Sequence, residues 1–170
     1  MTSLPLILLV LLPFAGAFVS ACLPNGSRNR PAFAAGAFTL VALIFAISQF
    51  GRLDADEVLQ SRHSWLPMFG LDLIIRMDGL AWLFSLLIQG IFLLVILYAR
   101  YYMSKRDPVA RFYAYMLAFM GSMMGVVLSG NLIQLVVFWE LTSLTSFLLI
   151  GYWQESNDAR RGARMAFTVT

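Results

Sequence analysis

The sequence is poor in charge, cysteine and histidine, and each shortage excludes a class of protein. Of its 170 residues, 12% are charged and 60% are hydrophobic, whereas a soluble domain of this length needs far more polar surface. One cysteine cannot form an internal disulfide, and the single histidine, His63, has no second metal ligand near it in the sequence. We therefore expect no metal site, and we interpret His63 as a solvated loop residue.

Motifs of common enzymes and of nucleic-acid binders are missing as well. The chain has no glycine-rich phosphate loop, no nucleophile elbow and no pair of carboxylates suited to hydrolysis. Its basic residues are not interleaved with aromatic ones in a polar patch, which is the arrangement that nucleic-acid binding requires. We expect neither a cofactor nor a nucleic-acid partner.

What the sequence does contain is long stretches without charge. Residues 1–27, 31–51 and 79–99 carry none, and Glu140 is the only charge from residue 112 to residue 154. A helix needs about 20 apolar residues to cross a bilayer core of about 30 Å. The last stretch would be about 65 Å long as one helix, so we predict that it folds back at Ser129-Gly130-Asn131, its only turn signal.

These stretches predict an all-α membrane protein with five complete transmembrane helices and the start of a sixth. The five are expected near residues 3–23, 32–50, 78–99, 112–129 and 131–153, and the sixth begins near Gly162 and is cut off at Thr170. An alternative for the first helix is a lipoprotein signal peptide ending at Cys22, but no basic residue precedes its apolar part, which is long enough to span a membrane.

Two smaller patterns concern the loops and the packing. The longest loop, about residues 52–77, alternates around Leu71–Met77, which is typical of a short strand or of an interfacial segment. In the fourth predicted helix, Gly121, Gly125 and Ser129 recur every four residues, a stripe of small residues that lets another helix approach closely.

The distribution of lysine and arginine predicts the orientation. The first, third and fifth loops hold nine of the twelve basic residues, and the second holds the other three, diluted by acidic residues. Basic residues are retained in cytoplasmic loops. We therefore expect the first loop to lie inside and the N-terminus outside.

The most unusual residue is Glu140, which lies nine residues beyond Asn131. That spacing places its carboxyl group about 13 Å below the turn, near the middle of the membrane. An ionised carboxylate costs several kcal/mol at that depth unless it protonates, pairs with a cation or lines a wet cavity. Two interpretations stay open: a protonated structural residue that bonds a neighbouring helix, or a group whose charge changes as protons or cations move.

Five further polar residues are candidates to support Glu140. Ser143, one helical turn on, is expected on the same face, where it can hydrogen-bond the carboxyl group or hold a water beside it. Gln134, Thr142 and Thr145 are expected on the opposite face, so the helix should lie inside a bundle with polar contacts on both flanks. Asp78, at the start of the third helix, is expected to be a helix cap or an ion-entry residue.

No cation in the sequence lies at the depth of Glu140. The only lysine, Lys105, is in a loop, and all eleven arginines lie in loops or at helix ends. A cationic partner therefore has to come from a later helix or from another subunit, or there is none.

Four segments resemble the antiporter-like membrane subunits shared by Mrp-type Na⁺/H⁺ antiporters and the proton-pumping arm of respiratory complex I. They are "MDGLAWLF", "RFYAYMLAFMGSMMGVVLSGNLIQLVVFWE", "FWELTSLTSFLLIGYW" and "ARRGARMAFTVT". The run "WELTSLTSFLLIGYW" is more similar to the large A subunit of Mrp antiporters than to complex I chains, which tend to have a glycine soon after the glutamate.

This resemblance implies the N-terminal fragment of a larger antiporter-like fold. Residues 1–60 would be two lead-in helices and the start of an outer loop, and residues 61–170 the start of the proton-translocating domain. The position of Glu140 matches the family's key carboxylate, which pairs with a lysine on the seventh helix and tunes a relay of buried lysines and histidines. That lysine lies beyond this sequence, so we do not expect the segment to transport ions unaided.

The implied function is that of a subunit of a multisubunit monovalent cation/proton antiporter, with Na⁺ as the expected cation and other antiporter subunits as partners. Such a chain is a secondary transporter in a bacterial inner membrane, not an enzyme. The alternative is an antiporter-like proton-pumping subunit of NADH:quinone oxidoreductase or of a related membrane hydrogenase, which would make it a translocase subunit. A scaffold of spans that transports nothing is the third possibility.

Overall fold

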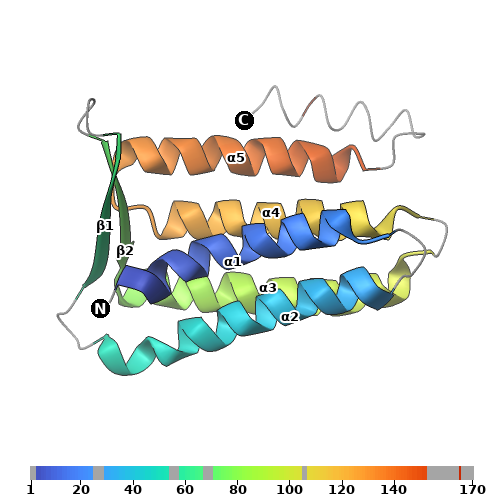
Figure 1. Cartoon of the computed structure of the whole chain (residues 1–170), viewed down its shortest axis with the longest axis horizontal. Coiled ribbons are helices and arrows are strands. Elements are labelled where there is room, and N and C mark those ends of the chain that lie inside the picture. Colours follow the sequence, from blue (N-terminus) through green and yellow to red (C-terminus); the bar gives the residue numbers. More distant parts are fainter. Residues whose placement is uncertain are drawn as a thin grey trace.

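A computed structural model describes residues 3–24, 29–53, 58–66, 71–104, 107–152 and 165 of the chain. Its main feature is a set of long helices that lie side by side (Figure 1). They are α1 (Ser3–Cys22), α2 (Asn29–Ser48), α3 (Gly79–Tyr102), α4 (Val109–Val127) and α5 (Leu132–Ile150). A short 3-10 helix, η1 (Phe50–Arg52), and two strands, β1 (Leu59–Leu66) and β2 (Leu71–Met77), complete the described elements.

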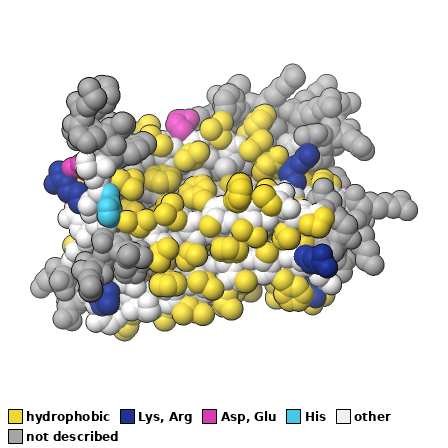
Figure 2. Space-filling view, viewed as in Figure 1, with side chains coloured by type: hydrophobic (Ala, Val, Ile, Leu, Met, Phe, Trp, Pro, Cys, Tyr) yellow, Lys and Arg dark blue, Asp and Glu magenta, His cyan; other side chains and the backbone are white. Residues whose placement is uncertain are grey.

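Four helical segments are long and apolar enough to cross a membrane. They are Asn29–Arg52, Gly79–Tyr102, Val109–Val127 and Leu132–Ile150. The apolar segment Leu6–Cys22 of α1 is shorter, and the predicted start of a sixth helix near Gly162 lies outside the described residues. The middle of the visible face is mostly hydrophobic (Figure 2). Large apolar side chains of the helices, such as Leu83 and Leu94, are more than half exposed. Together these features make the chain a multi-pass membrane protein.

Successive helices run in alternate directions. The end of α1, the start of α2, the end of α3 and the start of α4 lie at one end of the bundle, and the strands and the α4–α5 turn lie at the other (Figure 1). The helices also extend beyond the predicted spans at the first of these ends, where α3 includes Arg100 and α4 begins before Arg111. Basic residues can continue a helix there because they reach the polar interface.

The expectation of an all-α protein is wrong in one respect, because β1 and β2 form an antiparallel hairpin across one end of the bundle (Figure 1). Their pairing runs from Leu59 opposite Met77 to Ser64 opposite Asp72. Of the two alternatives for the segment from Leu71 to Met77, the strand is confirmed. Its inward side chains, Ile75 and Met77, are almost fully buried, as period-two alternation requires. The first strand escaped prediction because its polar sequence, "LQSRHSWL", has little apolar alternation.

Helix α4 is the centre of the bundle and packs against α1, α3 and α5. Its small residues explain how close two of these helices come. A Cβ atom added at Gly121 would lie 2.9 Å from the ring of Phe14 on α1, and one added at Gly125 would collide with Phe138 on α5. The predicted close approach is therefore confirmed, and it involves two different neighbours of α4. Met120 and Met124, which directly precede these two glycines, are fully buried packing residues.

Candidate functional site on helix α5

Helix α5 begins at the predicted turn. Asn131 is its N-cap, and its side-chain oxygen accepts a hydrogen bond of 2.7 Å from the backbone N–H of Gln134. The amide nitrogen of Asn131 also donates to the backbone carbonyl of Asp72 on β2, at 2.7 Å. One side chain thus caps the helix and ties it to the hairpin.

The hairpin is attached to the α4–α5 turn by further hydrogen bonds. The N–H of Gly130 donates to the carbonyl of Ile74 at 2.7 Å, and the N–H of Arg76 donates to the carbonyl of Leu128 at 2.9 Å. The side-chain oxygen of Gln134 accepts from the N–H of Ile74 at 2.9 Å. Strand β2 therefore pairs with β1 on one edge and with the turn on the other.

This attachment defines what Gln134 does in the described structure. Its side chain is only 4% exposed and bonds the hairpin. It lies six residues before Glu140, which is about 9 Å along the helix axis. The structure does not bring Gln134 to the carboxyl group of Glu140. Sequence reasoning missed its contact because Ile74 is 60 residues away in the chain.

Glu140 is the ninth of the 19 residues of α5 and is exposed on its surface. Val136, Val137 and Leu144 lie three or four residues from Glu140 and so share its face of the helix. Each of them is more than 40% exposed. Within the described ranges, no hydrogen bond or ion pair to the carboxyl group is found. The opposite flank of α5, which holds Phe138, packs on α4.

The hydroxyl groups near Glu140 bond the backbone of their own helix. Thr142 donates to the carbonyl of Trp139 at 2.6 Å, and Thr145 donates to the carbonyl of Leu141 at 2.7 Å. Ser143 is 8% exposed, and its hydroxyl lies 3.5 Å from the same carbonyl of Trp139. The described structure therefore contains no hydrogen bond from Ser143, Thr142 or Thr145 to the carboxyl group, and their predicted support of it stays a prediction.

Asp78 caps α3 at the hairpin end of the bundle. Its carboxylate accepts a hydrogen bond of 2.8 Å from the N–H of Ala81 and lies 3.6 Å from the guanidinium of Arg76. The capping role is thus observed. Because Asp78 follows β2 directly, one strand connects the start of α3 with the start of α5.

Tyr152 lies just beyond the other end of α5. Its ring meets that of Phe112 edge to face, with 5.4 Å between the ring centroids, which fixes α5 against the start of α4. Burial raises the pKa of the Tyr152 phenol to about 12, Asp107 adding to the rise and Arg111 opposing it. The phenol is therefore neutral at physiological pH. Helix α5 is anchored at both ends, while the described residues leave the face that carries Glu140 between them uncovered.

No metal site accompanies the carboxyl group in the described part of the chain. The described residues contain no group of three or more His, Cys, Asp or Glu side chains close enough to hold an ion.

Comparisons with known proteins agree with this structure. Residues 65–113 match the family model described as "NADH-Ubiquinone oxidoreductase (complex I), chain 5 N-terminus". Residues 129–170 match the model described as "NADH:quinone oxidoreductase/Mrp antiporter, TM", which includes the whole of α5.

Two relatives cover most of the chain. The probable A/B subunit of a K⁺/H⁺ antiporter of Rhizobium meliloti (strain 1021) is 54% identical over 161 residues, which are 95% of this chain. The A1 subunit of a Na⁺/H⁺ antiporter of Staphylococcus aureus (strain JH9) is 43% identical over 131 residues, or 77% of this chain. In both cases the chain spans only 16% of the relative's length.

Solved structures show the same arrangement of elements. The Mrp complex from Dietzia sp. DQ12-45-1b matches 93% of this chain and 17% of its own, with a TM-score of 0.76 and 27% identity. The archaeal membrane-bound sulfane sulfur reductase matches 96% of this chain and 25% of its own, with a TM-score of 0.77, and at 21% identity it supports the fold alone. The resemblance to antiporter-like membrane subunits, and in particular to the N-terminal part of the large Mrp-type chain, is confirmed.

Proposed function

We propose that this relative of the antiporter-like membrane subunits is the N-terminal part of one chain of a multisubunit monovalent cation/proton antiporter. Na⁺ is the cation we favour, although the relatives include both Na⁺/H⁺ and K⁺/H⁺ antiporter subunits. The observation that carries the proposal is Glu140, a carboxyl group at the middle of a membrane-length helix on a face that the described residues leave uncovered. Other antiporter subunits and the lipid bilayer are its partners.

The mechanism follows from the energy of a charge at that depth. An ionised carboxylate in the bilayer centre costs several kcal/mol, and this cost falls when a cation approaches or a proton binds. The protonation state of Glu140 therefore depends on its surroundings. A membrane potential of 100 mV contributes about 2.3 kcal/mol per charge moved across it, which is comparable with the energy of forming or breaking one ion pair. Glu140 can thus couple the entry of a proton to a change at a neighbouring site.

The uncovered face of α5 is where we place the cationic partner of Glu140. The chain spans a small part of its relatives' length, so further helices of the longer protein can cover this face. By resemblance, the partner is a lysine on the seventh helix. Asp78 has an observed capping role, and we extend to it a second role in ion entry, because it lies at the hairpin end of α3 near the surface.

The orientation we propose puts the hairpin outside the cell. The described basic residues at the opposite end include Arg30, Arg100 and Arg111, which the positive-inside rule assigns to the cytoplasm. In a bacterial inner membrane, the N-terminus would then lie outside. The protein would be a secondary transporter subunit without enzymatic activity of its own.

The second candidate function is an antiporter-like proton-pumping subunit of a redox-driven complex. It is favoured by the match of residues 65–113 to a complex I model. Two relatives named as antiporter subunits, at 54% and 43% identity, favour the antiporter. The driving force distinguishes the two candidate functions. An antiporter acidifies or alkalinises vesicles when Na⁺ or K⁺ is added, whereas a redox pump requires an electron donor.

The test is Glu140→Gln in the full-length subunit, expressed with its operon partners in a bacterium that lacks its own antiporters. We expect everted vesicles to lose Na⁺- or K⁺-dependent collapse of the pH gradient, because the amide cannot change its charge. Ser122→Ala on α4 is the control, since the Ser122 hydroxyl donates to the carbonyl of Ala118 in its own helix and is not part of the candidate site. Equal amounts of assembled protein are checked by immunoblot. If Glu140→Gln transports like the wild type, Glu140 is structural and the proposed mechanism is wrong.

A further inference from the structure

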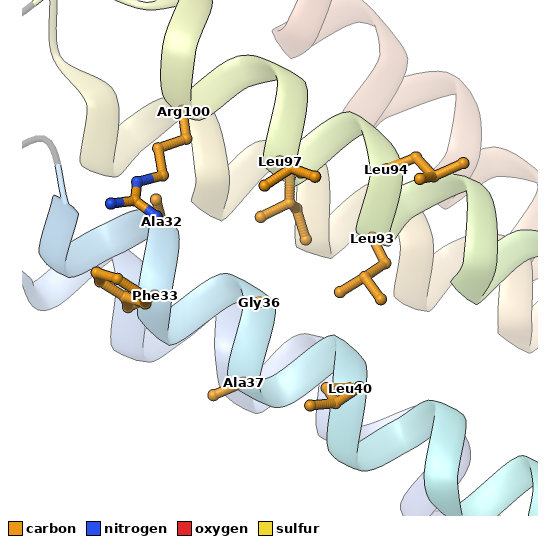
Figure 3. Close-up of a pocket in the computed structure, with 10 residues that line it drawn as sticks. Ala32, Phe33, Gly36, Ala37, Leu40, Leu93, Leu94, Leu97 and Arg100 are labelled. Carbon is orange, nitrogen blue, oxygen red and sulfur yellow. The ribbon is translucent and has the colours of Figure 1, made fainter.

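A groove runs between α2 and α3 on the outer surface of the bundle, away from Glu140. Its volume is about 480 Å³. Small side chains of α2 and leucines of α3 form its walls, and an arginine closes one end (Figure 3). Its main lining residues are Ala32, Gly36, Leu40, Leu93, Leu97 and Arg100.

The groove exists because α2 is small along this line. At Gly36 an added Cβ would meet only Ile96, at the ordinary contact distance of 3.8 Å, so the glycine leaves room along the helix surface. From Ala32 to Leu40 the groove follows α2 for about 12 Å. Along this length the lining is apolar except for Arg100, which suits a hydrocarbon chain.

Arg100 gives the groove one polar end. Its guanidinium carbon lies 4.6 Å from the ring centroid of Phe33 and 5.8 Å from that of Tyr101. No carboxylate pairs with it among the described residues. Stacking uses the face of the guanidinium and leaves its edge N–H groups available, and these are the groups that bind a phosphate in a bidentate manner.

The groove and the arginine together match one ligand. In a membrane protein this surface faces lipid, the apolar walls suit an acyl chain, and the cation lies at the end of the helix, where headgroups lie. Arg30, in the first turn of α2, adds a second exposed cation at the same end. We propose that this groove binds an anionic phospholipid, with one acyl chain between α2 and α3 and its phosphate on Arg100. This site is independent of Glu140 and of the proposed transport.

The headgroup is tested by native mass spectrometry of the full-length protein, purified with its co-purifying subunits. Phosphatidylglycerol and phosphatidylcholine with identical acyl chains are titrated in detergent. We expect Arg100→Gln to weaken binding of phosphatidylglycerol about 5-fold, the contribution of one basic residue near an anionic surface, and to leave phosphatidylcholine binding unchanged. Arg52→Gln, at the opposite end of the bundle, is the matched control. Equal phosphatidylglycerol binding in the wild type and Arg100→Gln overturns the proposal.

The acyl-chain part is tested by filling the groove. Gly36→Leu places a branched side chain in it, whereas Gly90→Leu, whose added Cβ has no atom within 4 Å, adds the same side chain to α3 outside the lining. We expect only Gly36→Leu to reduce the binding of both lipids. If Gly36→Leu instead releases a co-purifying subunit without changing lipid binding, the groove is a protein contact and the proposal is wrong. If Arg100→Gln does not fold, Arg100→Lys and Gly36→Leu are used instead to test whether the groove binds the phospholipid.

Discussion

Replacing Gly130 with alanine should break the backbone pairing between β2 and the α4–α5 turn. The added Cβ would lie 2.8 Å from the carbonyl oxygen of Ile74 and would collide with the Ile74 side chain. Real Cβ atoms do not approach backbone atoms this closely, and neither group is the flexible end of a side chain. Strand β2 must therefore move away from the turn.

The energy of this change can be worked from the hydrogen bonds across the contact. Two backbone bonds join β2 to the turn, from Gly130 to Ile74 and from Arg76 to Leu128. Each contributes about 1 kcal/mol net, so Gly130→Ala should cost about 2 kcal/mol for local opening of the hairpin. That corresponds to an approximately 30-fold larger population of the open state.

Hydrogen–deuterium exchange measures this opening directly. In the full-length protein we expect the amides of β2 and the turn to exchange about 30-fold faster in Gly130→Ala, with α1 and α2 unchanged. Gly79→Ala is the matched control, because it lies at the same end of the bundle and its added Cβ meets no atom within 4 Å. The reasoning is refuted if Gly130→Ala and Gly79→Ala exchange at the same rate in β2.

Replacing either of two other side chains should change the stability of the protein, in opposite directions. Thermal unfolding in detergent measures both changes. Asp78→Ala should destabilise the protein by about 1 kcal/mol, because the N–H of Ala81 loses its cap. Asp78→Asn keeps the cap. Loss of transport in a stable Asp78→Asn variant would support a role of Asp78 in ion entry, whereas unchanged transport would mean that Asp78 is only a helix cap. Gln89→Met should be neutral or stabilising by about 1 kcal/mol, since the fully buried amide oxygen of Gln89 has no hydrogen-bond partner in the described structure. A clearly less stable Gln89→Met would contradict this.

The positions of the helices could be predicted because the membrane requirement is local. A run of about 20 uncharged residues is visible in the sequence without any knowledge of its neighbours. The same holds for the turn at Ser129-Gly130-Asn131 and for the place of Glu140 in the middle of its helix. Both follow from counting residues along one segment.

The contacts of the hairpin could not be predicted because they are not local. From the sequence of α5 alone, Gln134 is a candidate to support Glu140. Its side chain instead bonds Ile74, which lies in a different element. Likewise, the stability of β1 depends on its pairing with β2, since its own sequence, "LQSRHSWL", is mostly polar. A weak signal was available in the alternation of Leu73, Ile75 and Met77, which indicated a strand but not its partner.

The burial pattern of α5 indicates where the further helices that we propose would pack. In α4, fully buried residues such as Tyr113 and Met120 meet neighbouring helices on several sides. The described residues cover helix α5 on one side, and on its other side they leave Val136, Glu140 and Leu144 exposed. The valine and leucine would be stable against lipid, but an ionised Glu140 would cost several kcal/mol there. A polypeptide that carries a cation or a wet cavity removes that cost, and lipid does so only by forcing the carboxyl group to stay protonated. The outer face of α5, and not the interior of the described bundle, is therefore where charge transfer and further helices should meet.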